Sequence, residues 1–83
     1  MLSQLHTAAK VVGIKQSKKI IRDGEAHQVF IAQDAEQRVT RPIYDLCEEH
    51  GVAIVEVPTM KELGKAAGIA VGAAVVTVTK ETL

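Results

Sequence analysis

The sequence predicts an α/β protein, a three-layer α/β/α sandwich built on a four-stranded mixed sheet. Short runs rich in Val and Ile alternate with longer segments whose apolar residues recur at helical spacing. Strands that alternate with helices require crossover connections, which place helices on both faces of a parallel or mixed sheet. Phe30 and Tyr44 are the only aromatic residues among 83, so the core has to be built from aliphatic side chains.

The N-terminal third is expected to hold a short helix, a short strand and a second helix. Ser3 is a suitable N-cap for a helix over residues 3–9, and residues 10–12 form a brief strand that Gly13 interrupts. Residues 15–23 are polar with apolar insertions at helical spacing, and a glycine follows them, as is typical of a helix C-terminus.

The middle of the chain is expected to contain a buried strand and a longer helix. Residues 28–32 are rich in residues that favour strands, and they precede a polar stretch over residues 34–41. That stretch turns into a helix near residues 40–42, because proline is well tolerated in a first helical turn. Leu46 and Cys47 then share the apolar face of this helix, which ends at the next glycine.

The C-terminal third is expected to hold two strands around a short helix. Residues 52–57 form a strand that Pro58 ends. Residues 59–62 (Thr-Met-Lys-Glu) match a capping box, in which the Thr and Glu side chains satisfy orphan backbone donors. The helix that follows stops at Gly68, and residues 74–79 form the last strand.

Charge is distributed unevenly along a chain whose formal net charge is zero. Residues 10–22 contain five cations and no acid, whereas all ten acids lie among the other five cations. On a helical wheel the cations of residues 15–23 fall within an arc about 100° wide, opposite Ser17, Ile20 and Ile21. Like charges three and four residues apart repel by about 0.2–0.5 kcal/mol per pair, so this arrangement indicates an anionic partner.

The cationic face of this helix consists of Lys15, Lys18, Lys19 and Arg22, with Gln16 at its edge. The cations lie near a helix N-terminus, where the dipole favours anions, so a docked phosphate would relieve their repulsion. Glutamine forms paired hydrogen bonds to an adenine edge, and lysine bonds guanine. An ordinary solvated surface, with Gln16 as a plain polar residue, is the alternative interpretation.

The apolar loop, residues 69–73 (Ile-Ala-Val-Gly-Ala), carries no charge. A loop of this composition is either buried in the domain or touches a partner, and both interpretations stay open. In the second case it forms a small platform for extruded bases, and Gly72 keeps its backbone approachable.

Enzymatic, metal-binding and membrane roles are not indicated by the sequence. The three histidines, His6, His27 and His50, lack metal-ligand spacing, and no glycine-rich phosphate loop occurs. Cys47 is the single cysteine and is expected in the core. We therefore expect no enzyme, no cofactor and no metal. In the absence of a signal peptide or a long apolar run, we expect a cytoplasmic, monomeric single domain over residues 1–83.

Residues 13–19 (Gly-Ile-Lys-Gln-Ser-Lys-Lys) resemble the Gly-x-Asn-Glu-x-Thr-Lys motif of kink-turn-binding ribosomal proteins, the L-seven-Ae family. Residues 29–35 are similar to that family's next strand and acidic turn, and residues 46–49 and 63–68 match further family blocks. Residues 69–73 fall on its apolar RNA-contacting loop. The match covers nearly the whole chain, and the Lys-Gln pair is typical of the short bacterial YbxF-like branch.

This resemblance implies the α/β/α fold and binding to kink-turns, which are RNA bends with sheared G·A pairs beside a bulge. It also implies a ribosomal or ribosome-associated role. By position, Lys15 and Gln16 would read the G·A edges, Lys19 would contact phosphate or a base edge, and Glu36 would lie near the extruded base. The implied RNA-binding residues are Gly13, Ile14, Lys15, Gln16, Lys18, Lys19, Arg22, Glu36, Ile69, Ala70, Val71, Gly72 and Ala73.

The sequence departs from the family pattern at two places. The usual Asn-Glu is Lys15-Gln16 here, and a neutral amide accepts a hydrogen bond about half as strongly as a carboxylate. Many relatives have proline at the position of Gly72, so the loop loses rigidity. A protein-interaction scaffold of the same fold remains the alternative function, because near-neutral charge and an apolar loop also fit a protein interface.

Overall fold

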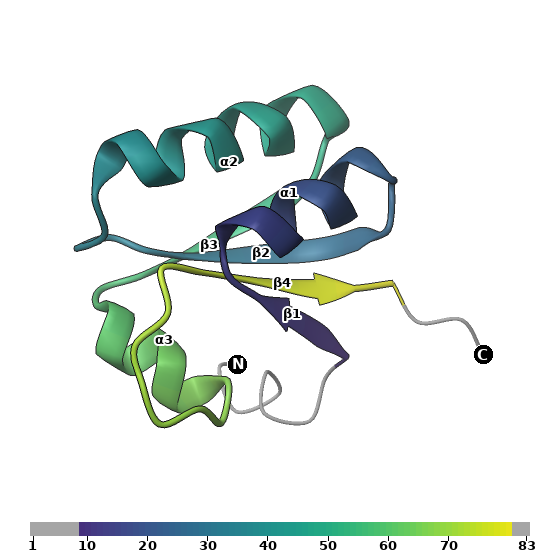
Figure 1. The fold of residues 1–83 in the computed structure, drawn as a ribbon. Coiled ribbons are helices and arrows are strands. Elements are labelled where there is room, and N and C mark those ends of the chain that lie inside the picture. Colours follow the sequence, from purple (N-terminus) through teal and green to yellow (C-terminus); the bar gives the residue numbers. More distant parts are fainter. Residues whose placement is uncertain (1–8, 81–83) are drawn as a thin grey trace.

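A four-stranded sheet between helices forms the computed structural model, which describes residues 9–80 (Figure 1). The elements in chain order are β1 (Lys10–Val12), α1 (Ile14–Arg22), β2 (Ala26–Ala32), α2 (Gln37–His50), β3 (Ala53–Val57), α3 (Met60–Ala66) and β4 (Val75–Thr79). Helices α1 and α2 cover one face of the sheet and α3 covers the other, so the predicted three-layer α/β/α sandwich is confirmed (Figure 1). The helix expected over residues 3–9 lies, apart from Ala9, outside the described residues.

The last strand of the chain is inserted into the middle of the sheet. The strand order is β1-β4-β2-β3, in which β4 is antiparallel to both neighbours and β2 is parallel to β3. The predicted mixed sheet is therefore confirmed. Because β4 runs against β1 and β2, the beginning of β4 lies beside the ends of both, and this brings distant parts of the sequence to one edge.

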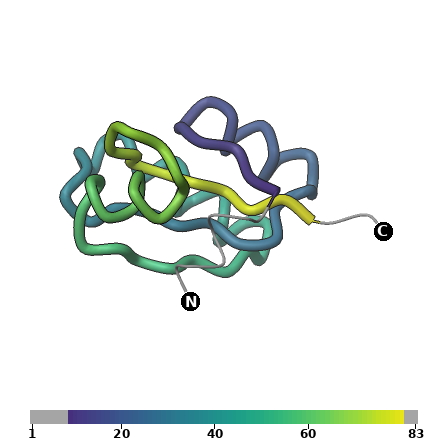
Figure 2. The backbone as a smooth tube through the Cα atoms, turned by 90° about the horizontal axis from the view of Figure 1, so that it is seen from below, coloured from purple at the N-terminus to yellow at the C-terminus, as the bar shows by residue number. Residues whose placement is uncertain are grey.

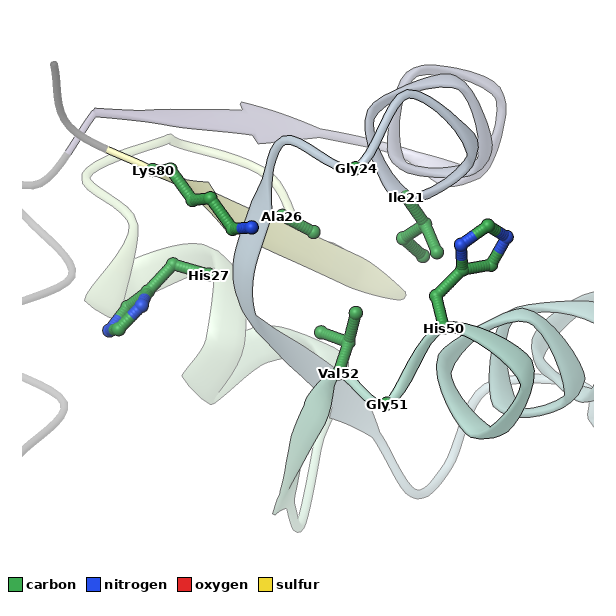
Figure 3. A pocket seen from close by; sticks show the side chains of 8 residues that line it. All are labelled: Ile21, Gly24, Ala26, His27, His50, Gly51, Val52 and Lys80. Carbon is green, nitrogen blue, oxygen red and sulfur yellow. The ribbon is translucent and has the colours of Figure 1, made fainter.

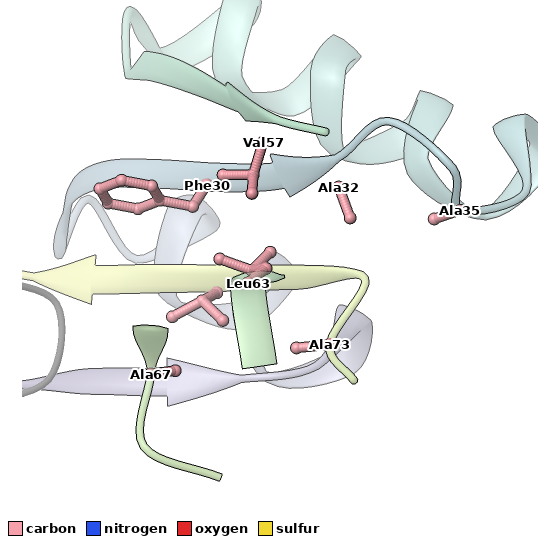
Figure 4. Packing of buried hydrophobic residues seen from close by; sticks show 8 residues of the cluster. Phe30, Ala32, Ala35, Val57, Leu63, Ala67 and Ala73 are labelled. Carbon is pink, nitrogen blue, oxygen red and sulfur yellow. The ribbon is translucent and has the colours of Figure 1, made fainter. Parts of the chain in front are cut away.

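Two aliphatic clusters fill the spaces above and below the sheet. Alternate residues of β2 supply both, since Val29 and Ile31 face α1 and α2 while Phe30 faces α3. Figure 4 shows the cluster on the α3 side, where Leu63 of α3 is fully buried. The expectation of a core built from aliphatic side chains is confirmed, and Phe30 is the one ring among the buried residues that the structure describes.

The start of α2 differs from the prediction. The helix begins at Gln37, so Pro42 lies in its second turn rather than its first. The Glu36 carbonyl accepts hydrogen bonds from the N–H groups of Val39 and Thr40, at 3.0 and 3.1 Å. Both of these residues are at least half-buried, so packing extends the helix ahead of the proline. Strand β2 likewise begins two residues early, at Ala26, after an irregularity in its pairing with β4.

Local sequence signals account for the ends of the helices. Each helix ends at or just before a glycine with positive φ, at Gly24, Gly51 and Gly68. The Thr59 hydroxyl accepts a hydrogen bond from the Glu62 N–H group at 3.0 Å, which confirms the threonine half of the capping box. Within the described part of the chain, no helix has the length and apolar character needed to cross a membrane.

Thr77 is a buried polar residue of β4 whose replacement is expected to stabilise the fold. Its hydroxyl has no hydrogen-bond partner among residues 9–80 and no solvent exposure. Thr77→Val keeps the shape and removes the unsatisfied group, so the free energy of unfolding should rise by about 1 kcal/mol in urea titrations. Thr40→Val is the matched control, because the Thr40 hydroxyl bonds the Glu36 carbonyl and its loss should destabilise. A lower stability for Thr77→Val would contradict this interpretation.

Candidate functional site

Three segments that are distant in the sequence meet at the edge of the sheet where β4 begins. They are the start of α1, the turn between β2 and α2, and the apolar loop before β4 (Figure 1). The Gly13 N–H group donates to the Val75 carbonyl and the Ala32 N–H group donates to the Ala74 carbonyl, both at 2.9 Å. These bonds fix the start of α1 and the end of β2 to residues 74–75, directly after the apolar loop.

The N-terminus of α1 is left open by its sequence. Gly13 is the N-cap and has φ 109°, a conformation that favours glycine. Among the described residues no side chain caps the first turn of α1, and that turn contains no acid. Free backbone N–H groups and the helix dipole therefore favour an anionic or hydrogen-bond-accepting group at this end.

The cationic face of α1 is exposed, as predicted, except that Lys18 is half-buried. Lys15, Gln16, Lys18, Lys19 and Arg22 line a shallow groove of about 470 Å³. The opposite side of the helix is buried against the sheet through a serine and an isoleucine, which confirms the predicted segregation. Within residues 9–80, no acidic side chain forms an ion pair with any of these four cations. Their charge is therefore available to a partner.

The apolar loop is anchored to α3 at both ends and exposed in the middle. The Ile69 N–H group donates to the Gly64 carbonyl and the Ala73 N–H group donates to the Met60 carbonyl, each at 3.0 Å. Ile69 is half-buried and Ala73 is buried in the α3-side cluster, whereas Val71 is 73% exposed. Of the two interpretations left open by the sequence, burial applies to the ends of the loop and exposure to its apex.

Two glycines allow the loop to lie directly against α3. A Cβ atom at Gly64 would overlap the Val71 carbonyl oxygen, and one at Gly72 would lie 3.2 Å from Met60. Gly72, expected to keep the loop backbone approachable, is exposed and also lies directly against α3. Gly64 was missed, although a glycine inside a helix costs about 1 kcal/mol relative to alanine and signals a packing requirement.

Glu36 stands at the N-cap of α2, next to the same edge. Its carboxylate accepts a hydrogen bond from Arg38 Nε at 2.9 Å, and the two side chains are 66% and 85% exposed. Exposed ion pairs contribute little, about 0–1 kcal/mol, so a ligand can replace either partner. Arg38 was not among the predicted site residues, because nothing in the local pattern distinguishes it from other surface arginines.

The residues that could support catalysis or metal binding lie elsewhere. Cys47 is fully buried, and burial raises the pKa of its thiol to about 11, so the thiol stays protonated. His27 and His50 border a hollow of about 200 Å³ at the opposite end of the molecule, where only His50 is directed toward Ile21 (Figure 3). Among residues 9–80, no group of three potential metal ligands occurs.

Comparisons with known proteins find relatives that are named RNA-binding proteins. An RNA-binding protein of Caldanaerobacter subterraneus subsp. tengcongensis is 51% identical over 65 residues, which are 78% of this chain and 79% of that protein. RNA-binding protein YbxF of Geobacillus stearothermophilus is 38% identical over 68 residues, 82% of this chain and 83% of the relative. The solved Giardia lamblia 15.5kD RNA binding protein superposes with a TM-score of 0.90 at 26% identity, covering 96% of this chain and 71% of that one. Residues 2–82 match the sequence pattern of one protein family, and the chain therefore belongs to the Ribosomal protein L7Ae/L30e/S12e/Gadd45 family.

Proposed function

We propose that this chain is a non-catalytic RNA-binding protein that recognises kink-turns in structured RNA, ribosomal RNA among them. The observation that carries the proposal is the backbone bond between Gly13 and Val75, which joins the start of the cationic helix to the strand that directly follows the exposed apolar loop. A cationic face alone suits any polyanion. A neighbouring apolar apex suits an RNA in which a base has left the stack. The names of the relatives support the same class of ligand.

The roles of the residues follow from their positions in this site. Regular A-form RNA has a major groove too deep and narrow for side chains, whereas a kink opens it. Lys15 and Gln16, in the first turn of α1, read the edges of the sheared G·A pairs. Lys19 and the other cations of the face neutralise phosphates, and Val71 covers an extruded base. RNA crosslinked to the protein in cells should therefore be concentrated at kink-turns.

Gln16→Ala and Lys19→Ala are each expected to weaken binding to a kink-turn duplex by about 1–3 kcal/mol, the usual value of one good base-edge pair. Equilibrium titration of a labelled kink-turn at fixed salt measures the loss. Lys80→Ala also removes one exposed lysine, but at the opposite end of the molecule, and should change affinity by less than about twofold. Unchanged affinity for both Gln16→Ala and Lys19→Ala would contradict the assignment.

A further inference from the structure

We infer that Asp34, in the turn after β2, is a positioning residue that fixes the apolar loop through Met60. The inference rests on the proposed function, because it concerns how the loop half of that site is held. Asp34 lies two residues before Glu36 and 26 residues before Met60, and no sequence pattern connects it to the loop.

A chain of two hydrogen bonds joins Asp34 to the loop. Asp34 Oδ1 accepts from the Met60 N–H group at 2.8 Å, and the Met60 carbonyl accepts from the Ala73 N–H group at 3.0 Å. Met60 is the first residue of α3, so its N–H group has no partner within the helix. A carboxylate is a strong acceptor for such a group because it also faces the positive end of the helix dipole.

The second cap of α3 does not duplicate this role. Thr59 accepts from the Glu62 N–H group, one turn into the helix, and makes no bond to Met60. Both side chains therefore stabilise the start of α3, but of the two only Asp34 bonds Met60 to the turn after β2. This difference makes Thr59 a matched control for simple helix capping.

Packing transmits the position of Met60 to the loop. Gly72 lies so close to Met60 that an added Cβ would meet its backbone and Cβ at 3.2 Å. Figure 2 shows the chain before β4 doubling back beside α3, and Ala35 and Ala73 share one buried cluster (Figure 4). A shift of Met60 therefore displaces the residues next to Val71. The start of α1 is held separately, by the bond from Gly13 to β4.

Hydrogen exchange in the free protein tests the positioning without any RNA. In Asp34→Ala the Ala73 amide should exchange at least about tenfold faster, while the Gly13 amide should not change. Asp34→Asn keeps an oxygen acceptor and should restore slow exchange at Ala73. If Asp34→Ala leaves Ala73 unchanged, or if Thr59→Ala accelerates Ala73 equally, the inference is overturned.

Binding to a kink-turn duplex tests the functional consequence. Asp34→Ala should lower affinity about fivefold or more, and Asp34→Asn should recover most of it. In double-mutant cycles, Asp34→Ala should be non-additive with Val71→Ala, whose side chain it positions, and additive with Lys19→Ala. Additivity with Val71→Ala would overturn the inference. Failure of the wild-type protein to prefer kink-turns would refute the proposed function alone, because the exchange experiment still tests the link from Asp34 to the loop.

Discussion

The double substitution Lys15→Glu with Lys19→Glu is expected to abolish kink-turn binding, with an affinity loss of at least about a hundredfold, or about 2.8 kcal/mol. Both lysines are exposed on α1 and have no acidic partner within the described chain. Each change removes an attraction to the RNA and adds a repulsion in its place. Fluorescence anisotropy with a kink-turn duplex at constant salt measures the loss.

The matched control is Lys61→Glu with Lys65→Glu. These lysines are also exposed and four residues apart on a helix, so the change in net charge and spacing is the same. Helix α3 lies on the other face of the sheet from α1 (Figure 1), and although it anchors the apolar loop, neither lysine is among the proposed RNA-binding residues. This control should lower affinity by less than about fivefold, because it changes the charge near the RNA without removing a proposed contact. Equal losses in both variants would mean that net charge, rather than the α1 face, governs binding.

Gly64→Ala is expected to displace the apolar loop and to weaken kink-turn binding at least about tenfold, or about 1.4 kcal/mol. The new methyl group would overlap the Val71 carbonyl oxygen, which is backbone and has to move. Overpacking costs about 1–3 kcal/mol and exceeds the gain of about 1 kcal/mol in helix propensity. Parallel measurements of affinity and thermal unfolding should therefore show both values falling.

Gly51→Ala separates loop displacement from general destabilisation. Gly51 has φ 67° at the end of α2, so alanine there is strained although its Cβ would meet nothing within 4 Å. We expect a comparable loss of stability but wild-type affinity at a temperature where the protein is folded. Wild-type affinity in Gly64→Ala would show that the position of the loop does not matter for binding.

Local patterns were sufficient to predict most of the fold. Apolar periodicity, the Thr59 cap and the glycines after the helices are local signals, and all of the elements within residues 10–79 appeared close to their predicted places. The start of α2 was wrong because burial of Thr40 overrode the preference of proline for a first turn. The insertion of β4 between β1 and β2 depends on long-range pairing, which periodicity does not encode.

The candidate site, too, was predictable from the sequence only where its features depend on local patterns. The cationic face follows from helical spacing and from the absence of acids in residues 10–22, so it was available in the sequence. The composition of the loop made it recognisable in the sequence. Its contact with Gly64 was not predictable, because it depends on how the chain folds back over α3 before β4. The bond between Asp34 and Met60 was hidden for the same reason.

The most direct test of the account compares two RNAs with the wild-type protein. One contains a kink-turn, and the other is a straight duplex of the same length and nearly the same composition, without the bulge and with Watson–Crick pairs in place of the G·A pairs. At matched salt we predict a preference for the kink-turn of at least about a hundredfold, from base-edge contacts added to common phosphate contacts. Equal affinity for the two RNAs would contradict the account.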